Sequence, residues 1–274
     1  MSARRSQLLE EMGLGPVWRL RKRQESGCRI QDSGPERQDL GSRIEDSPAA
    51  SKGEKSSTIF DKSMPESSSA PEPAEDDRGA RILRMDWPEL KATVAGCNAC
   101  ALSKSRTQSV FGVGDEHAEW LLVGEAPGAE EDARGEPFVG QAGRLLDNML
   151  ASIDLKRGHN VYIANVLKCR PPRNRNPEAY EVAQCSPHLM RQIELIQPKL
   201  ILAMGRFAVQ ALLDTDATIA SLRGKLHRYR GVPLVVTYHP AYLLRNLLDK
   251  AKAWEDLCFA RRVMAKMKSD GGAN

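Results

Sequence analysis

The 274-residue sequence lacks the features that mark membrane and secreted proteins. No apolar run approaches the roughly 20 residues that a helix needs to cross a bilayer, and the N-terminus has no apolar signal-peptide core. Aromatic residues make up only 5%, and a net charge of +4 is too small a bias to identify a partner by itself. We therefore expect a cytoplasmic protein without membrane association, in a compartment where structural disulfides are rare.

The first eighty residues have few apolar side chains and many of Ser, Glu, Asp, Arg, Pro and Gly. Such a composition buries too little apolar surface to offset the entropy of ordering, so residues 1–80 are predicted to be a mostly disordered extension. Residues 8–23 within it, LLEEMGLGPVWRLRKR, are compatible with a short amphipathic helix and a basic arm. A solvated tail is the favoured interpretation of this arm, and a docking element is the alternative. Residues 81–274 suffice for one ordinary domain.

From residue 119 onward, short apolar runs alternate with longer amphipathic ones. Strands are predicted over 119–124, 161–166, 199–205 and 232–240, and helices over 142–155, 176–196, 206–213 and 241–267. Asn176 is expected to cap the second helix with Pro177 at its first position, and Pro187 to kink or break it. Strands that are apolar on both faces and alternate with helices indicate an α/β fold. The prediction is a three-layer αβα sandwich with a central four-stranded parallel sheet.

Three strand exits carry the unusual residues of the sequence: GEAPG at 124–128, NVLKCRPP at 165–172 and HPAYLLR at 239–245. In parallel sheets, functional loops lie beyond the carboxyl ends of the strands. These three exits are therefore expected to converge on one site.

The first exit continues as a glycine-rich loop over 124–143. Such loops often bind phosphate, but this one contains no lysine and lacks the G-x-x-x-x-G-K-[ST] spacing, which argues against a nucleoside triphosphatase. Phe138 within it has two interpretations, a plug of the core or a stacking surface for a flat ring.

Similar pairs of interpretations apply to the other exits. His239, fixed by the following proline, is placed to donate a hydrogen bond, although a lone histidine is often only structural. Asn165 could cap a turn, or its carboxamide could pair with an imide edge such as that of uracil. Leu243 and Leu244 could wedge between bases or begin the core face of the last helix.

Four of the six cysteines form a chemical signal. Cys97 and Cys100 are a C-x-x-C pair, and Cys169 and Cys185 are separated by fifteen residues. Four thiolates suit zinc or an iron–sulfur cluster, and the wide second pair favours the cluster. Cys258, in a helical pattern, is read as an ordinary buried thiol.

With these cysteines, the segments GEAPGAEEDARGEPFVGQAG, NVLKCRPPRNRNP and HPAYLLR resemble the family 4 uracil-DNA glycosylases, the iron–sulfur branch of the uracil-DNA glycosylase superfamily. The resemblance covers roughly residues 81–268. It implies a monofunctional DNA N-glycosylase of base excision repair, which flips uracil out of single- or double-stranded DNA and hydrolyses its N-glycosidic bond. Free uracil and an abasic site are the products. A monomeric catalytic domain over 81–274 is expected. Contact of the extension, which lies outside the resemblance, with DNA or with a repair or replication partner is the alternative to a solvated tail.

The resemblance also implies roles for particular residues. A 4Fe–4S cluster with a structural role is expected on Cys97, Cys100, Cys169 and Cys185. Phe138 is expected under the uracil ring, Asn165 on N3–H and O4, and His239 near O2. The backbone of Glu125 and Ala126 would close the edge of the pocket, and the Glu125 side chain would pack against C5 to exclude thymine. The expected catalytic residues are His239, Asn165 and Glu125.

Contacts with DNA are expected from two groups of residues. A basic patch after the second strand would consist of Lys168, Arg170, Arg173 and Arg175, with Lys225, Arg228 and Arg230 extending it. A wedge after the fourth strand would consist of Leu243, Leu244 and Arg245.

One departure concerns the water-activating group. Family 1 enzymes carry an aspartate in the first motif, whereas this loop reads Ala-Pro-Gly-Ala over 126–129. Glu130, Glu131 and Asp132 follow and could contribute, or could only stabilise the helix start. A histidine-bearing insertion typical of a covalently reacting branch is absent, so ordinary turnover is expected.

Two other classes stay open on sequence grounds. One is a non-catalytic DNA-binding module that serves as a scaffold, and the other is a zinc-bound nucleotide hydrolase. A non-catalytic module would release no free uracil from DNA, whereas a glycosylase would. A zinc protein would be colourless, whereas a protein with an iron–sulfur cluster would be brown.

Overall fold

The computed structural model describes residues 76–271, with side chains from residue 78 onward. Almost all of the predicted extension over 1–80, including its arm at 8–23, lies outside these residues. The first described helix, α2, begins at Asp76, a few residues before the predicted boundary at 81. Of the helices in the described part of the chain, none combines the length and the apolar character that crossing a membrane would take.

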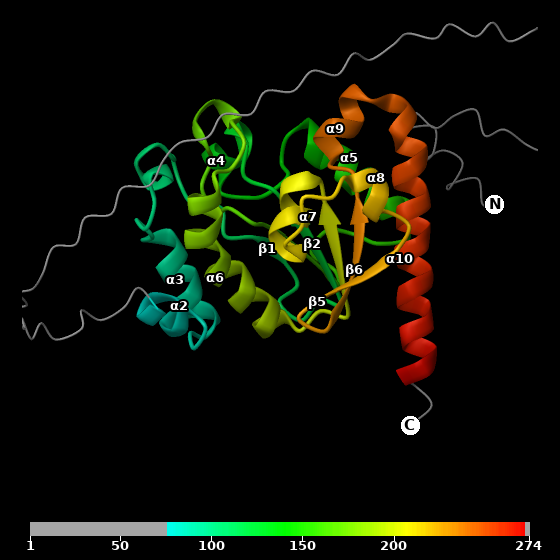
Figure 1. Cartoon of the computed structure of the whole chain (residues 1–274), viewed down its shortest axis with the longest axis horizontal. Helices are drawn as coiled ribbons and strands as arrows, with labels where there is room; N and C mark the ends of the chain where they lie inside the picture. The colour runs from blue at the N-terminus through cyan, green and yellow to red at the C-terminus, as the bar shows by residue number, and fades with distance from the viewer. Residues whose placement is uncertain (1–75, 272–274) are drawn as a thin grey trace, which may run out of the picture. The chain divides into compact units, whose positions relative to one another are not determined.

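A six-stranded sheet in the order β1-β3-β2-β4-β6-β5 forms the centre of the fold (Figure 1). Its four inner strands are parallel: β3 (Val161–Asn165), β2 (Trp120–Gly124), β4 (Leu200–Met204) and β6 (Val232–Thr237). Two antiparallel strands form the edges: β1 (Val113–Gly114) and β5 (Leu226–Tyr229). The predicted four-stranded parallel sheet is confirmed as the core of a mixed sheet, and the two edge strands were not predicted.

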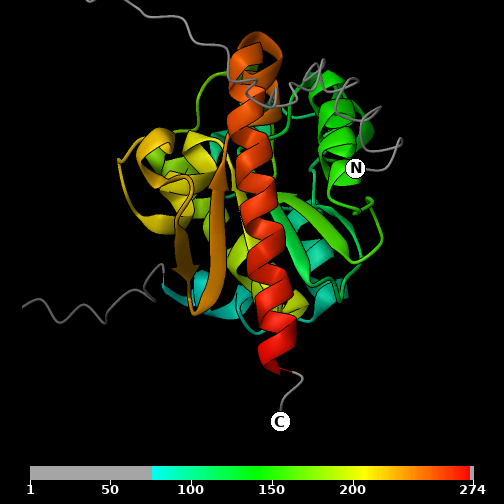
Figure 2. The same cartoon turned by 90° about the vertical axis from the view of Figure 1, so that its right-hand side faces the viewer.

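Helices cover both faces of this sheet, which confirms the three-layer αβα sandwich. On one face lie α5 (Gln141–Ser152) and α10 (Lys250–Gly271), and α10 runs along the strands in Figure 2. On the other face lie α6 (Ala179–Ile196) and α7 (Arg206–Leu213). The remaining helical elements are α2 (Asp76–Ile82), α3 (Trp87–Ala95), η1 (Ala101–Lys104), α4 (Ala129–Arg134), η2 (Pro172–Asn174), α8 (Ile219–Leu222), α9 (Pro240–Arg245) and η3 (Leu247–Asp249).

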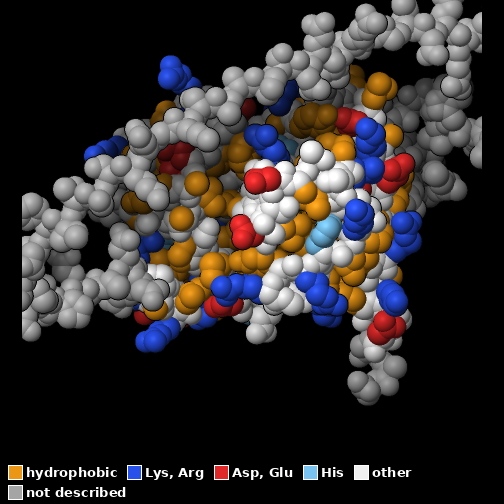
Figure 3. Space-filling view, viewed as in Figure 1, with side chains coloured by type: hydrophobic (Ala, Val, Ile, Leu, Met, Phe, Trp, Pro, Cys, Tyr) orange, Lys and Arg blue, Asp and Glu red, His pale blue; other side chains and the backbone are white. Residues whose placement is uncertain are grey.

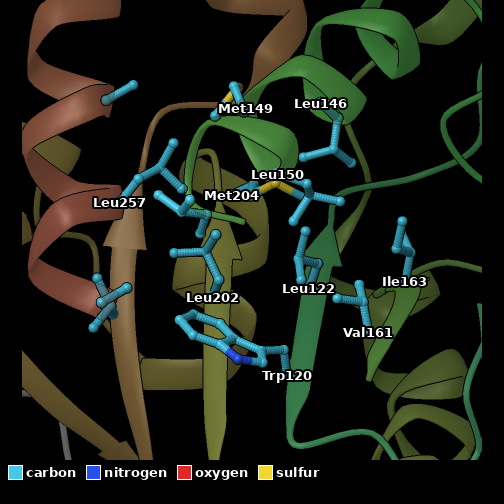
Figure 4. Close-up of a cluster of buried hydrophobic side chains, with 14 of the residues drawn as sticks. Trp120, Leu122, Leu146, Met149, Leu150, Val161, Ile163, Leu202, Met204 and Leu257 are labelled. Carbon is cyan, nitrogen blue, oxygen red and sulfur yellow. The ribbon is translucent and has the colours of Figure 1, made fainter. Parts of the chain in front are cut away.

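Alternation along each inner strand divides the core into two clusters. Leu122 and Leu202 point toward α5 and α10, where they meet Leu146 and Leu257 (Figure 4). Their neighbours in the strands face α6 and α7 instead, as expected for side chains that alternate across a sheet. Because both faces are covered, the four inner strands are apolar except at their ends, where β3 finishes with Asn165 and β6 with Thr237.

Helix α6 begins later than predicted, at Ala179, and its N-cap is Glu178. The prediction of Asn176 as cap is wrong, because the Glu181 carboxylate accepts the Glu178 N–H at 3.0 Å and fixes the start there. The helix continues through Pro187 to Ile196, so of the predicted kink or break the break is wrong.

The segment predicted as one final helix over 241–267 contains a turn. Helix α9 ends at Arg245, Asn246 leaves helical geometry with φ −125° and ψ 75°, and α10 starts at Lys250. The hydroxyl of Tyr242 donates to Asp249 Oδ2 at 2.6 Å and holds the two sides of this turn together. The turn leaves Leu248 93% exposed.

The substitution Leu122→Ala tests the central core. Leu122 is fully buried between the sheet and α5, so removing its side chain should lower the free energy of unfolding by about 2–5 kcal/mol. Urea denaturation followed by circular dichroism measures this loss. Leu248→Ala, at an exposed site, is the matched control and should change stability by less than about 0.5 kcal/mol; equal losses in both variants would contradict this core.

Candidate active site

The three strand exits named above meet beyond the carboxyl edge of the sheet. Gly124 lies opposite Asn165 in the parallel register of β2 and β3, and its carbonyl oxygen accepts the Val166 N–H at 3.0 Å. On the other side, Gly205 N–H donates to Thr237 O at 3.0 Å and joins the ends of β4 and β6. Between these ends lies a cavity of about 820 Å³. Its lining includes all five predicted pocket residues, Glu125, Ala126, Phe138, Asn165 and His239.

Phe138 forms a flat wall of the cavity. Its ring stacks against the imidazole of His239 with centroids 5.3 Å apart and planes inclined by 29°. Its backbone has φ +56°, an unfavourable value for a bulky residue. Arg157 stabilises this conformation by donating to Phe138 O at 2.8 Å and to Pro137 O at 2.9 Å. No sequence pattern pointed to Arg157, which lies in a loop remote from the motifs.

Asn165 lines the cavity with an unused hydrogen-bonding group. Its side chain is buried, and Oδ1 has no hydrogen-bond partner among the described residues. Leaving a buried polar atom unpaired costs about 1–3 kcal/mol. The arrangement is therefore suited to a ligand that brings a donor to this oxygen.

His239 enters the cavity as the N-cap of α9. Its Nδ1 accepts the Ala241 N–H at 3.1 Å, so the proton of the neutral ring sits on Nε2. Burial, together with the positive charge of Arg245, lowers the pKa of His239 to about 4. At neutral pH the ring is an uncharged donor through Nε2–H.

Glu125 is a cavity carboxyl whose charge is disfavoured. Burial raises the pKa of Glu125 to about 7, against the opposing effect of Arg206. The acidic residues of α4 have other uses: Glu131 accepts N–H groups of Gly128 and Val139 at 3.1 and 3.0 Å. Asp132 accepts Thr107 N–H with both oxygens at 3.0 Å. Glu131 and Asp132 therefore stabilise the loop.

The four predicted metal-binding cysteines lie in one region beside the second exit. Cys169 and Cys185 are buried and pack in one cluster with the half-buried Cys100. Burial raises the pKa of Cys169, and it raises that of Cys185 to about 12. Arg106 opposes the rise in the pKa of Cys169, and Lys168 opposes that of Cys185, but burial outweighs both. Without a metal these two thiols would stay protonated.

Three N–H donors point at the sulfurs. Arg106 Nη1 lies 2.9 Å from Cys169 Sγ, Arg78 Nη2 lies 3.5 Å from Cys97 Sγ, and the Lys168 backbone N–H donates to Cys185 Sγ at 3.3 Å. Within residues 76–271, no three His, Cys, Asp or Glu side chains converge closely enough to hold a single metal ion.

Two residues of the predicted DNA-binding set are buried. Lys168 is 1% exposed, and its ammonium donates to Asn165 O at 2.8 Å and to Gln192 Oε1 at 2.6 Å. Leu243 is 1% exposed and packs in the core between the sheet and α5. Both predictions are corrected: neither side chain reaches a surface that DNA could touch.

The arginines of that set lie nearer the surface, and they differ in whether a neighbouring side chain binds them. Arg173 is exposed, and Arg170 Nε donates to Asn174 Oδ1 at 2.7 Å. Arg175 is held in an ion pair with Glu181 at 2.6 Å. On the face seen in Figure 3, Lys and Arg side chains are scattered among other types and do not form one large patch.

After the third exit, Leu244 is 38% exposed and Arg245 is exposed. The same turn exposes Leu247 and Leu248, which the sequence-based prediction missed. The apolar pair in NLLD, placed between polar residues, was the available signal.

Comparisons with known proteins identify the family of this chain. The family model of the uracil DNA glycosylase superfamily matches residues 111–258. A type-4 uracil-DNA glycosylase of Archaeoglobus fulgidus is 49% identical over 164 residues, which span 57% of this chain and 82% of that protein.

Two further relatives narrow the assignment. The type-4 uracil-DNA glycosylase of Thermotoga maritima is 44% identical over 177 residues, and that of Pyrobaculum aerophilum is 39% identical over 181 residues. Each match spans 63% of this chain and 92% of the relative. The chain belongs to the type-4 uracil-DNA glycosylases.

The protonation of His239 can be tested directly. The ring should titrate with a pKa of about 4, below its ordinary 6.5, because burial disfavours the charged form. The fold therefore favours the neutral ring, and this contribution to stability is complete above pH 6.5 and declines as the pH falls toward 4. Correlation spectra of the ring nitrogens across the pH range measure the pKa, with exposed His117 as a reference signal. A midpoint at or above 6.5 would contradict the buried neutral ring.

Proposed function

We propose that this protein flips uracil out of DNA and hydrolyses its N-glycosidic bond, releasing uracil and leaving an abasic site for base excision repair. The observation that carries the proposal is the buried, unpaired Asn165 Oδ1 in a cavity walled by the stacked Phe138 and His239 rings. Family membership supports the same reaction.

Recognition of the base follows from hydrogen-bonding complementarity. A carboxamide offers an acceptor and a donor side by side, and uracil offers N3–H beside O4. We assign Asn165 to this edge, so that the unpaired Oδ1 accepts N3–H. Phe138 supplies the stacking surface, and the Glu125 and Ala126 segment closes the remaining edge. We assign the Glu125 side chain to the position facing C5, where the methyl group of thymine would collide.

Catalysis is assigned mainly to His239. When the glycosidic bond breaks, negative charge develops on uracil O2, and a fixed donor at that atom lowers the barrier. The neutral imidazole offers Nε2–H, because Nδ1 accepts the Ala241 N–H. Because this donor is neutral, His239 does not have to take up a proton before the reaction at physiological pH. Water then attacks C1′ of the sugar and loses a proton, and the uracil anion takes up a proton as it is released.

A 4Fe–4S cluster bound by Cys97, Cys100, Cys169 and Cys185 forms part of the proposal. When bound, it would supply a structural cross-link between three separated segments of the chain. Each thiolate of such a cluster would bind a different iron, so the four thiols need not converge as closely as a single ion requires. Cys100, Cys169 and Cys185 pack together, and Cys97 lies near enough to Cys169 and Cys185 to interact electrostatically with both. The N–H donors at Cys97, Cys169 and Cys185 favour thiolates at these positions.

The DNA backbone and stack are assigned to residues that reach the surface. Arg173 and Arg170 of the second exit are suited to phosphates, which supply most of the affinity for nucleic acid. Leu244 and Arg245, with Leu247 and Leu248, form an apolar tip beside a cation that would fill the gap left by a flipped base. The monomeric state, and a contact of the N-terminal extension with DNA or a partner, stay predictions.

The substitution His239→Ala tests the catalytic assignment. Loss of the donor to O2 should reduce the single-turnover rate of uracil release by about 10²–10³-fold. DNA affinity should change little, because the imidazole acts mainly on the charge of the transition state. Excision from a labelled uracil-containing oligonucleotide, single- and double-stranded, followed by alkali cleavage, measures the rate. The exposed His117→Ala is the matched control and should excise normally; a weakened affinity with an unchanged rate would refute the assignment.

The substitution Cys169→Ala tests the cluster. The purified wild-type protein should be brown, with iron and sulfide in equal amounts, and the variant should lose most of both. Cys258→Ala, on α10 and outside the group of four, should retain them. Iron and sulfide analysis with visible absorption spectra decides the result. A colourless wild-type protein that contains zinc would overturn the proposed cofactor.

A further inference from the structure

Lys168 is buried without being an ion-pair partner of any described carboxylate. It is among the largest fully buried side chains, and its Nζ donates to the backbone oxygen of Asn165 at 2.8 Å and to Gln192 Oε1 at 2.6 Å. Gln192 is itself fixed, because its Nε2 donates to Phe111 O at 2.9 Å and its side chain is fully buried on α6. The ammonium therefore joins α6 to the last residue of β3.

The same residue also borders the cysteine region. Its backbone N–H donates to Cys185 Sγ at 3.3 Å, and the next residue in the chain is Cys169. Negative charge on either sulfur would act on the ammonium, since both cysteines lie near enough to interact electrostatically with it. One residue thus spans the distance between the proposed cluster and the proposed base-reading asparagine.

Packing alone does not explain an ammonium at this position. A buried cation loses its hydration and must be compensated by acceptors and nearby negative charge. A methionine has a similar length and would fill the space without that cost. The two acceptors are neutral, and the groups beside Lys168 that could carry negative charge are Cys185, whose sulfur accepts the Lys168 backbone N–H, and the adjoining Cys169.

We propose that Lys168 is a positioning residue that couples the iron–sulfur site to base recognition by holding the end of β3 from which Asn165 reads uracil. The ammonium fixes the Asn165 carbonyl oxygen, and thiolates at Cys169 and Cys185 would stabilise the buried ammonium when a cluster is bound. This inference rests on the proposed function and extends it to a residue that touches neither the base nor the metal. It predicts that base recognition and cluster electrostatics change together when Lys168 is replaced.

The first test is a double-substitution cycle on the cluster-loaded enzyme. Lys168→Met should lower single-turnover uracil release on the order of tenfold to a hundredfold, because small displacements of a recognition group are costly. If Lys168 acts through Asn165, Lys168→Met should add less than about twofold to the loss already caused by Asn165→Ala. Losses that multiply in the double variant would overturn the inference.

The second test reads the cluster and not the activity. Removing a positive charge near the thiolates should shift the reduction potential of the cluster to more negative values, because adding an electron becomes less favourable. Protein electrochemistry on wild type and Lys168→Met measures the shift. An unchanged potential would overturn the coupling, even if excision falls.

Control variants separate this role from general destabilisation. Ile193→Ala, next to Gln192 on α6 but facing the apolar core, should destabilise the fold and leave both the excision rate and the potential unchanged below its unfolding temperature. If Lys168→Met does not fold, Gln192→Met removes one acceptor and should show a smaller loss that is likewise not additive with Asn165→Ala. Normal excision by wild type, by Lys168→Met and by Gln192→Met would refute this inference and leave the proposed function intact. A wild-type enzyme that releases no uracil would refute the proposed function together with the inference.

Discussion

The pocket depends on the pairing of β2 with β3, because this register places Gly124 opposite Asn165. A Cβ atom at residue 124 would lie 2.4 Å from Asn165 Oδ1 and 2.6 Å from Phe138 Cζ. The carboxamide and the aromatic ring occupy that space only because residue 124 has no side chain. A shift of the register by one residue would turn the Asn165 side chain to the other face of the sheet. The same strand register therefore determines both the pairing of the sheet and the position of the proposed recognition side chain.

Burial sets the chemistry of the cavity by favouring neutral forms. It lowers the pKa of His239 to about 4, so the imidazole is uncharged near neutral pH, and it raises that of Glu125 to about 7, so a large share of this carboxyl is protonated there. Such a cavity suits an uncharged base more than a phosphate. The absence of lysine from the glycine-rich loop is consistent with the proposed division, in which exposed arginines such as Arg173 would contact the DNA backbone.

Sequence patterns predicted the parts of the fold that repeat along the chain. Apolar runs identified four parallel strands, and their exits identified Phe138, Asn165 and His239 as neighbours. The patterns did not predict the direction in which an individual side chain points. Lys168 follows β3 in a basic segment, but its side chain turns inward to Gln192, 24 positions away, and no local pattern contains that contact. Strand β1 has only two residues, too few for any period.

Buried contacts on both sides of Pro187 explain why helix α6 continues through this proline. Cys185 and Gln192 are seven positions apart, which is two turns, so they lie on the same face of a continuous helix. That face presents a sulfur to the cysteine region and an amide oxygen to the ammonium of Lys168. A break at Pro187, between them, would separate the two contacts. Because Pro187 has no N–H, the helix gives up one backbone hydrogen bond there. The buried contacts on both sides of Pro187 are what offset that loss.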